Sequence, residues 1–503
     1  MSLNRRHFVK TGGGCFAAMA AFSFEQGPVA WDPSRPFLNV TRGLTVQPVF
    51  MYRISQRKEQ TSWKSWGGIQ TEEAAAQEMA RIDRELASLA SSSALSLKFL
   101  PVAPVSSPEQ AARVHESGHD VLLLYACTGS GQLLTSCVSP RKDSLIFVRH
   151  RSGPVYYWYE ALSTRYLSTP GGDSEKHGTA TGGRVHVDDV VVDDYRELLS
   201  KLRGLSGARN LLGTRIVALG GPMGKYSPEA PEVARNKFKI EIVDVSYDDF
   251  ARRIQAARAD ARLVSAAEQC ARRYLELPGT TLRTGPSFVT NAFLLYHLFK
   301  ELLAEHSASA FTIKNCMNTI MPMSETTACL TLSLMNDEGL MAFCESDFVI
   351  IPAGILLRHL SGLPVFLHNS TFPHQRLVTC AHCTAPRRMN GAQYNPALIV
   401  THYESEYGAA PKVEIPAGQE VTFVDPEYSS GRWVGFKGIV RDNPFYEICR
   451  SQQDVEIQGS WELLKGEARD SHWVLAYGDH LNELGYAARK LGIRWMDLSK
   501  SQG

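Results

Sequence analysis

The chain has 503 residues, with 53 lysines and arginines against 52 aspartates and glutamates, and a formal net charge of +1. This length exceeds what one hydrophobic core supports and predicts roughly two to four domains. The balanced, well-mixed charge excludes the broad electrostatic field of a nucleic-acid-binding or membrane-surface protein. No internal apolar run approaches the ~18 residues of a membrane-spanning helix, so no span is expected in the mature form.

The first residues carry the pattern of an export signal. Residues 4–10 (NRRHFVK) resemble the twin-arginine motif, and a weakly apolar Gly/Ala stretch follows over 12–24. The pattern predicts export by the twin-arginine machinery to a periplasmic or extracytoplasmic location, with residues 1–36 as signal and linker. A basic tail ahead of a first helix is the alternative interpretation.

Ten cysteines are scattered through largely apolar contexts, which indicates buried thiols rather than a disulfide framework. Two of them flank a histidine in Cys380-Ala381-His382-Cys383. That spacing fits a redox pair or half of a zinc site, but the chain has no second CxxC motif to complete a four-cysteine site.

Strand and helix patterns alternate over residues 37–205, the first expected domain. A buried strand is expected at 121–126, and the Thr128–Gly131 turn after it lies where open α/β sheets bind ligands. The other elements expected in this domain are a strand at 47–54, a helix at 71–89 and a helix that Ser107 caps.

The second expected domain, residues 206–362, repeats the alternation. A strand at 215–219 leads into a glycine-rich turn at 220–225, which matches no full nucleotide-binding motif and is read as a sugar-contacting loop or plain turn. The other expected elements are a strand at 238–243, a long helix from Ser246 to Leu277 and a helix at 288–303. Alternating strands and helices favour parallel sheets, so both domains are predicted to be open and Rossmann-like.

From residue 363 the pattern changes to short alternating segments separated by turns rich in Gly, Pro, Asn and Ser. These segments predict an antiparallel β-barrel domain over 363–503, closed by a helix at 480–491 and a strand at 494–498. The expected fold class is therefore α/β, with two parallel-sheet domains followed by a β-barrel.

Two acids and a histidine stand out as candidates for chemistry. Glu345 and Asp347 lie in one tripeptide between apolar runs, and His382 lies between two cysteines. Charged side chains in such surroundings are costly unless they are paired or hold a metal. An acidic cap on a buried helix, and a structural histidine, are the alternatives that these residues leave open.

Five strings in the last two hundred or so residues resemble, in order, the L-fucose isomerase and L-arabinose isomerase-like family. They are CLTLSLMNDEGLMAFCESDF (329–348), LPVFLHNSTFPHQRLVTCAHCTAPRRM (363–389), THYES (401–405), the Cys449-Arg450 pair and SHWVLAYGDHLNEL (471–484). The domain boundaries also resemble the three-domain plan of that family.

The resemblance implies an aldose–ketose isomerase that works on an acyclic sugar through an enediolate, and a homo-oligomer. Such chemistry needs a base, an acid and a cation that holds the enediolate charge. The implied metal is Mn²⁺, for which Mg²⁺ or Co²⁺ could substitute. Glu345 and Asp347 are the catalytic candidates, and the candidate metal ligands are Glu345, Asp347, His472 and His382. The candidate substrate contacts are His402, Asn369 and Arg450.

The sequence departs from the family in one respect. The family uses another acid roughly twenty-five residues upstream, whereas the nearest candidate here is Glu325, and Asn315 and Asn318 stand where an acid is expected. His402 could orient a ligand imidazole or only pair within the barrel, and Arg450 could be a solvated surface arginine. Two further functions remain open: a non-catalytic carbohydrate-binding protein on the same scaffold, and a lyase or rearrangement enzyme that acts on a modified sugar.

Overall fold

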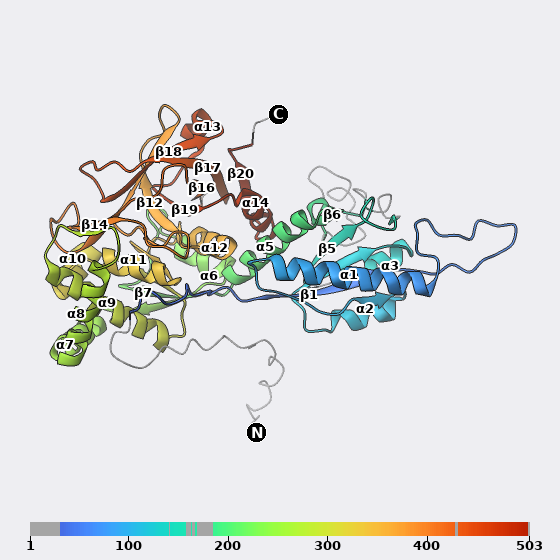
Figure 1. The fold of residues 1–503 in the computed structure, drawn as a ribbon, viewed down its shortest axis with the longest axis horizontal. Coiled ribbons are helices and arrows are strands. Elements are labelled where there is room, and N and C mark those ends of the chain that lie inside the picture. Colours follow the sequence, from blue (N-terminus) through green and yellow to red (C-terminus); the bar gives the residue numbers. More distant parts are fainter. Residues whose placement is uncertain are drawn as a thin grey trace, which may run out of the picture.

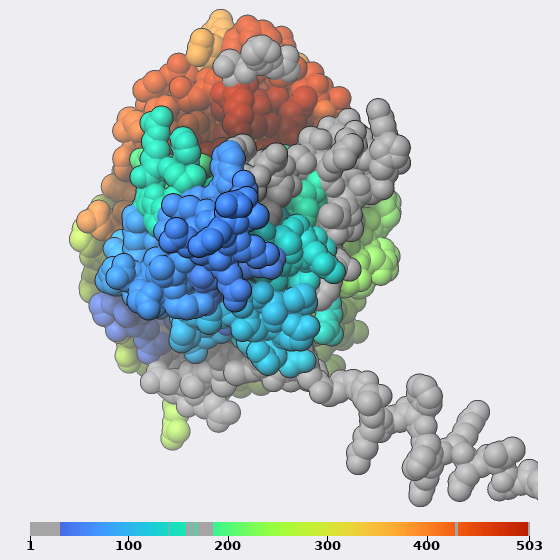
Figure 2. Space-filling model, turned by 90° about the vertical axis from the view of Figure 1, so that its right-hand side faces the viewer, coloured from blue at the N-terminus to red at the C-terminus, as the bar shows by residue number. Residues whose placement is uncertain are grey.

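The computed structural model describes residues 31–139, 141–156, 162, 166–167, 185–427 and 431–500. The twin-arginine pattern lies outside these residues. A parallel-sheet unit forms one end of the molecule, and a second parallel sheet and a β-barrel form the other, with helix α5 (Tyr195–Leu211) between them (Figure 1). Seen from the end where the first unit lies, that unit covers the front while the barrel rises above it (Figure 2).

The first unit is a six-stranded parallel sheet in the order β2-β1-β4-β5-β6, with β3 also paired to β1. Its strands are β1 (Leu44–Met51), β2 (Leu97–Phe99), β3 (Ala103–Val105), β4 (Val121–Ala126), β5 (Asp143–Val148) and β6 (Val190–Val192). Its helices are α1 (Glu72–Ser92), α2 (Pro108–His115) and α3 (Gly131–Cys137). Strand β4 is buried along its whole length, and Ser107 forms the expected capping box of α2.

The second unit is a four-stranded parallel sheet in the order β11-β10-β7-β8. Its strands are β7 (Arg215–Leu219), β8 (Glu241–Val245), β10 (Ala310–Ile313) and β11 (Met341–Phe343). Its helices are α6 (Ala230–Lys237), α7 (Tyr247–Ala259), α8 (Ala261–Leu275), α9 (Pro286–Glu305), α10 (Cys316–Ser324), α11 (Cys329–Glu338) and α12 (Ile351–Ser361).

Two expected elements of the second unit were wrong in their bounds. The single helix expected from Ser246 to Leu277 is divided into α7 and α8 at Asp260. The backbone of Asp260 is extended, and its carboxylate accepts the N–H groups of Arg262 and Leu263 as an N-cap. The strand expected to begin at Phe238 begins at Glu241, because Phe238 instead closes α6.

The third unit contains a closed antiparallel barrel of six strands, which confirms the expected architecture. The strands follow the order β16-β19-β12-β13-β18-β17, and β17 pairs back to β16. They are β12 (Phe366–Ser370), β13 (Leu377–His382), β16 (Glu420–Glu427), β17 (Arg432–Asp442), β18 (Ser451–Gln458) and β19 (His472–Tyr477). Around it lie α13 (Trp461–Glu467), α14 (Leu481–Lys490) and β20 (Arg494–Asp497), which pairs in parallel with β17.

Two connections join the units. Strand β9 (Thr280–Leu282) from the second unit pairs with β14 (Ala397–Val400), which also pairs with β15 (Ala410–Val413). Helix α5 approaches α12 and α14 at two glycines. A Cβ on Gly207 would lie 2.5 Å from Leu360, and one on Gly204 would lie 2.9 Å from Tyr486. Among the described residues, no helix is long and apolar enough to cross a membrane.

One hydrophobic cluster runs from the helices of the second unit into the barrel interior, whereas the first sheet packs mainly in a cluster of its own. Phe423, Phe436 and Trp473 contribute the aromatic part of the barrel interior. The second sheet and the barrel therefore share a core, and the carboxyl end of that sheet is held against the barrel strands.

Candidate metal centre

The acidic tripeptide forms a tight turn between β11 and α12. Glu345 and Ser346 both have left-handed backbone conformations, with φ of 64° and 50°. Such conformations cost roughly 1–3 kcal/mol each in non-glycine residues and persist only where the surroundings impose them. Here the turn after β7 does so: the N–H of Met223 donates to the Ser346 carbonyl at 3.1 Å, and Phe348 donates to the Met223 carbonyl at 2.8 Å.

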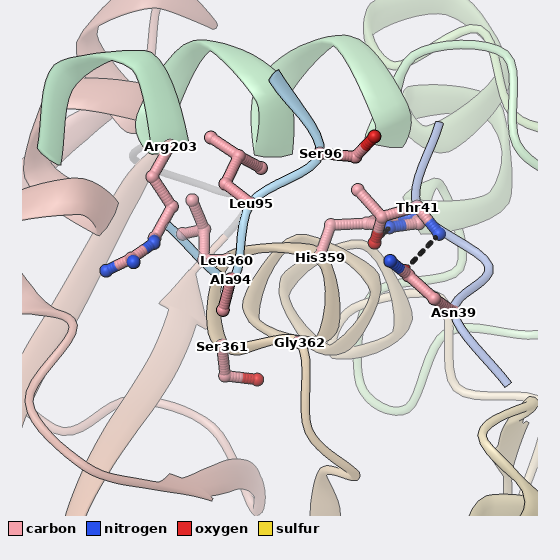
Figure 3. Close-up of a pocket in the computed structure, with 10 residues that line it drawn as sticks. All are labelled: Asn39, Thr41, Ala94, Leu95, Ser96, Arg203, His359, Leu360, Ser361 and Gly362. Atoms are coloured by element: carbon pink, nitrogen blue, oxygen red, sulfur yellow. Dashed lines mark hydrogen bonds between the residues drawn. The ribbon is translucent and has the colours of Figure 1, made fainter. Parts of the chain in front are cut away.

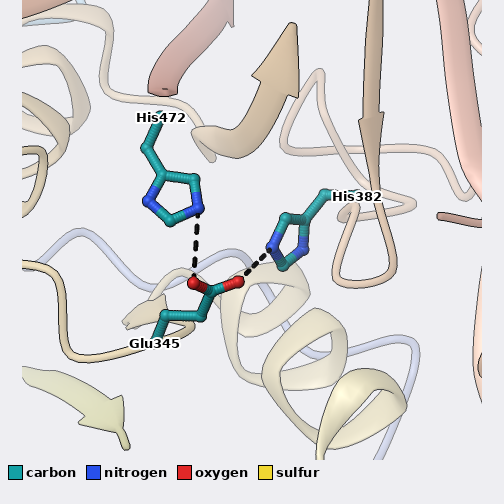
Figure 4. Close-up of side chains that lie close together, drawn as sticks. All are labelled: Glu345, His382 and His472. Carbon is teal, nitrogen blue, oxygen red and sulfur yellow. Dashed lines mark ion pairs between the residues drawn. The ribbon is translucent and has the colours of Figure 1, made fainter. Parts of the chain in front are cut away.

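Glu345, His382 and His472 converge in front of this turn. One oxygen of the Glu345 carboxylate lies 3.8 Å from His382 Nε2 and the other lies 3.6 Å from His472 Nε2 (Figure 4). One potential ligand atom from each residue lies within 4.8 Å of the others. Both imidazoles are buried, whereas the Glu345 side chain is 40% exposed, so one face of the group is open to solvent.

The pairing of barrel strands explains how the two histidines meet. His382 is the last residue of β13 and His472 is the first residue of β19, and both strands pair with β12. Within β12, Asn369 is opposite Ala381 on one side and His472 on the other. Asn369 therefore lies between the two ligand strands, and its side-chain amide donates to the Ser471 carbonyl at 3.3 Å.

Asp347 lies behind His472 rather than in the group of three. Its side chain is fully buried, and one oxygen is 2.7 Å from His472 Nδ1. The other oxygen accepts the backbone N–H groups of Lys225 at 2.9 Å and Val349 at 3.2 Å. A carboxylate on the second nitrogen of a ligand histidine fixes the orientation of the ring and increases its basicity. The two acids thus have different positions in one site.

Neighbouring charges shift the pKa values of this group. Burial opposes ionisation of Glu345, but His382 and His472 hold the pKa of its carboxyl well below the usual range. Burial also opposes charge on His472, yet Asp347 and Glu345 raise its pKa to about 9. Burial lowers the pKa of His382 in spite of Glu345. Asp347 and Glu345, on either side of His472, therefore favour the charged form of that imidazole.

Lys225 also belongs to the site, although it was not among the candidate site residues expected from the sequence. Its ammonium lies 3.2 Å from a Glu345 oxygen and 3.5 Å from His472 Nε2. It closes the glycine-rich turn after β7, a strand of the same sheet as β11. The signal in the sequence was a lysine in a turn at the carboxyl end of a parallel strand, where ligand sites form.

His402 and Arg450, two residues expected to contact substrate, are each hydrogen-bonded to a nearby residue. His402 is buried and lies 3.3 Å from the Ser405 hydroxyl, and burial lowers the pKa of its imidazole. Arg450 donates to the Thr401 carbonyl at 2.7 Å, and its guanidinium lies over the ring of Tyr403. The side chain of Arg450 is therefore held against residues 401–403.

The upstream acid does not reach the group. Glu325 ends α10, is exposed, and pairs with Arg258 at 2.6 Å. Asn315 precedes α10 in a left-handed conformation and makes no side-chain cap bond to that helix. Over the described ranges, Glu345, His382 and His472 form the one group of three ligand-type residues close enough to hold a metal.

The cysteines in the described part of the chain are all free, and all except Cys449 are buried. Cys380 belongs to the core shared by the barrel and the second unit, whereas Cys383 packs in a separate small cluster with Cys329 and Cys449. The two cysteines of the CxxC string therefore lie in different surroundings and do not act as one metal-binding pair.

A small cavity lies elsewhere, between residues 39–41, α5 and the end of α12 (Figure 3). Its volume is about 60 Å³, which leaves room for a few water molecules rather than a sugar. Its buried histidine, His359, contacts the Thr41 hydroxyl at 2.9 Å, and burial together with Arg358 lowers the pKa of that imidazole to about 3. This cavity contributes no acid to a second metal site.

The donor set of the three converging residues fits a divalent transition metal. Two imidazole nitrogens and a carboxylate oxygen suit Mn²⁺, Fe²⁺ or Zn²⁺, and the exposed side of Glu345 leaves positions for water or substrate. Ligand atoms about 2.0–2.3 Å from one ion lie roughly 3–4 Å apart, close to the separations between Glu345 and the two imidazoles.

The chain matches no protein-family model and no curated protein. The resemblance to the fucose and arabinose isomerases therefore rests on the motifs in the sequence alone. The chemistry of the chain must be inferred from the residues that converge between the second sheet and the barrel.

Proposed function

We propose that the protein is a metal-dependent aldose–ketose isomerase, similar to the fucose and arabinose isomerases, that acts on an acyclic sugar. The observation that carries the proposal is the convergence of Glu345, His382 and His472 at the carboxyl end of a parallel sheet, with one face open. This arrangement combines a cation site, which can hold the enediolate charge, with an accessible carboxylate, which can act as the base.

Glu345, His382 and His472 would hold the ion, for which we propose Mn²⁺, with Mg²⁺ or Co²⁺ as substitutes. When bound, the ion supplies a positive charge that stabilises the developing enediolate. Asp347 holds His472 in the tautomer that presents Nε2 to the site. The exposed Glu345 carboxylate would act as the base toward a substrate carbon, and Asn369 and His402 would contact the sugar.

Three further expectations belong to this proposal. The two parallel-sheet units are Rossmann-like, the protein is exported by the twin-arginine machinery, and it works as a homo-oligomer. Arg450, whose guanidinium lies over the ring of Tyr403, would contribute to substrate binding.

The deciding experiment incubates purified, Mn²⁺-loaded protein with L-fucose, D-arabinose, L-arabinose and related aldoses, and measures the ketose that forms. We expect at least one aldose to be converted, and conversion to stop on chelation. Ketose formation from none of the sugars, with metal bound, would refute the isomerase proposal.

A second candidate is a non-catalytic carbohydrate-binding protein on the same scaffold. The observation that favours it is the position of Glu325, which pairs with Arg258 and leaves the group with one ligand carboxylate. This candidate predicts sugar binding that survives chelation. Calorimetric titration of the same sugars with and without a chelator separates the two functions.

A further inference from the structure

The glycine-rich turn after β7 delivers a lysine to the metal-binding group. Gly220 and Gly221 both have positive φ, of 80° and 88°, and a Cβ on Gly220 would lie 2.3 Å from the ring of Tyr247. The end of the turn is fixed by the backbone bonds of Met223 and by the bond from the Lys225 N–H to Asp347. The backbone of Lys225 is therefore anchored, whereas its side chain remains 25% exposed.

The Lys225 ammonium contacts two of the three side chains that would hold the ion. It lies 3.2 Å from a Glu345 oxygen and 3.5 Å from His472 Nε2. An ion about 2.2 Å from the same Glu345 oxygen would lie no more than roughly 5.4 Å from the ammonium. Because both cations are attracted to one carboxylate and repel each other at this distance, they compete.

We propose that Lys225 is a cation built into this site, which neutralises Glu345 before an ion binds and moves away from that carboxylate when an ion arrives. In the loaded site the ammonium then donates to the substrate oxygen on which negative charge develops. The displacement of Lys225 by an ion is inferred from the contacts of Lys225. Its bond to the substrate rests on the proposed isomerase function.

The charges of the site support both parts. Glu345 and Asp347 provide two negative charges, which a divalent ion neutralises when both histidines are neutral ligands. Lys225 then leaves the loaded site with a net positive charge, which favours an anionic transition state. The long, partly exposed lysine side chain can move while its backbone stays bound to Asp347.

The test is Mn²⁺ binding by chelator-treated, full-length protein with Lys225→Met, a change that keeps an unbranched side chain one atom shorter and removes the charge. Calorimetry or the EPR signal of free Mn²⁺ gives the dissociation constant. We expect Mn²⁺ to bind roughly tenfold more tightly than to the wild type. The matched control is Lys437→Met, which removes a lysine that lies 2.7 Å from Asp479 outside the site, and its affinity should be unchanged.

Turnover tests the second part. If the ammonium serves the substrate, Lys225→Met should lose roughly 100-fold in kcat in spite of its tighter ion, and Lys225→Arg should recover part of that loss. Unchanged or weaker Mn²⁺ binding by Lys225→Met, and by Lys225→Gln if the first variant does not fold, would overturn the proposal. Tighter binding with full turnover would overturn the substrate role alone.

The two proposals fail in different ways. Suppose that the wild-type protein converts no sugar but Lys225→Met still binds Mn²⁺ more tightly. This outcome would support the displacement of Lys225 by the ion and would refute its role toward substrate. A wild-type protein that binds no Mn²⁺ overturns both proposals.

Discussion

The two parallel sheets end in different ways at their carboxyl edges. After β5, Arg149 is fully buried and donates to Glu78 at 2.5 Å and to Glu85 at 2.6 Å, while Tyr156 also donates to Glu78. These partners all belong to the first unit. After β11, by contrast, Glu345 finds its imidazole partners in the barrel.

The turns at the carboxyl ends of the two sheets differ in whether their polar groups remain free for partners in another unit. The Thr128–Gly131 turn of the first unit was a candidate ligand position, but its polar groups are used locally. The Thr128 hydroxyl accepts the N–H of Arg53 at 2.8 Å, and Ser130 caps α3. The turn at Glu345 instead presents a carboxylate to residues of another unit. Of these two turns, only the one at Glu345 therefore leaves a carboxylate and two imidazoles that can rearrange around an ion.

The largest effect should come from the closed network of the first unit. Arg149→Met leaves the buried carboxylate of Glu78 without its closest cation, removes one of the two arginines at the half-buried Glu85, and should reduce the free energy of unfolding by about 3–5 kcal/mol. Mn²⁺ affinity should stay unchanged in the fraction that folds. Urea unfolding measures the loss, and the exposed Arg196, changed to Met, serves as the control. A loss below ~1 kcal/mol would show that this network does not hold the first unit together.

At the second sheet, loss of the exposed charge should affect the ion rather than the fold. Glu345→Gln should weaken Mn²⁺ binding by at least ~100-fold because an amide lacks the charge that a divalent ion needs, and Asp347→Asn by roughly 10–100-fold through His472. Glu345→Gln should keep the unfolding free energy within about 1–2 kcal/mol of wild type, whereas Asp347→Asn also breaks the buried pair with His472 and should lower it by roughly 3 kcal/mol. Calorimetry measures the affinity, with Glu325→Gln as the control outside the site. Equal metal content in all variants would mean that neither acid serves an ion.

Without metal, stability should depend on pH through His472. Its pKa is raised from 6.5 to about 9, so the stabilisation is fully present below pH 6.5 and is lost as pH rises to about 9. The loss should amount to roughly 3 kcal/mol at most. Urea unfolding of chelator-treated protein across this window measures the slope, which His472→Gln should remove. An equal slope in that variant would assign the effect to another group.

The smallest effect should come from the turn of the first sheet. Ser130→Ala removes the side chain that accepts the N–H of Leu133 and should cost about 1 kcal/mol, whereas Ser130→Asp keeps a cap. Thermal unfolding distinguishes the variants. Neither should change Mn²⁺ binding or turnover, and a clear change in turnover would mean that this turn contacts substrate after all.

Local patterns in the sequence predicted much of the fold. The capping box at Ser107, the buried strand β4 and the short strands of the barrel were all visible, because each depends on residues close in the chain. The division at Asp260 was missed, since an aspartate can cap a helix or lie within one, and the competing backbone bonds decide.

The candidate site was predicted in its residues but not in its arrangement. Glu345, His382 and His472 converge because two barrel strands share β12 as a neighbour, and no local pattern reveals that pairing. The left-handed turn at Glu345 and the position of Lys225 likewise depend on contacts between segments more than a hundred residues apart. The long-range register of strands therefore decided the site.

The central claim is that Glu345, His382 and His472 bind one divalent ion. An anomalous difference map from crystals of the Mn²⁺-loaded protein tests it directly. We predict one peak in the site, about 2.0–2.3 Å from a Glu345 oxygen and from Nε2 of both histidines. No peak at saturating Mn²⁺, or a peak that these three residues do not contact, would contradict the account.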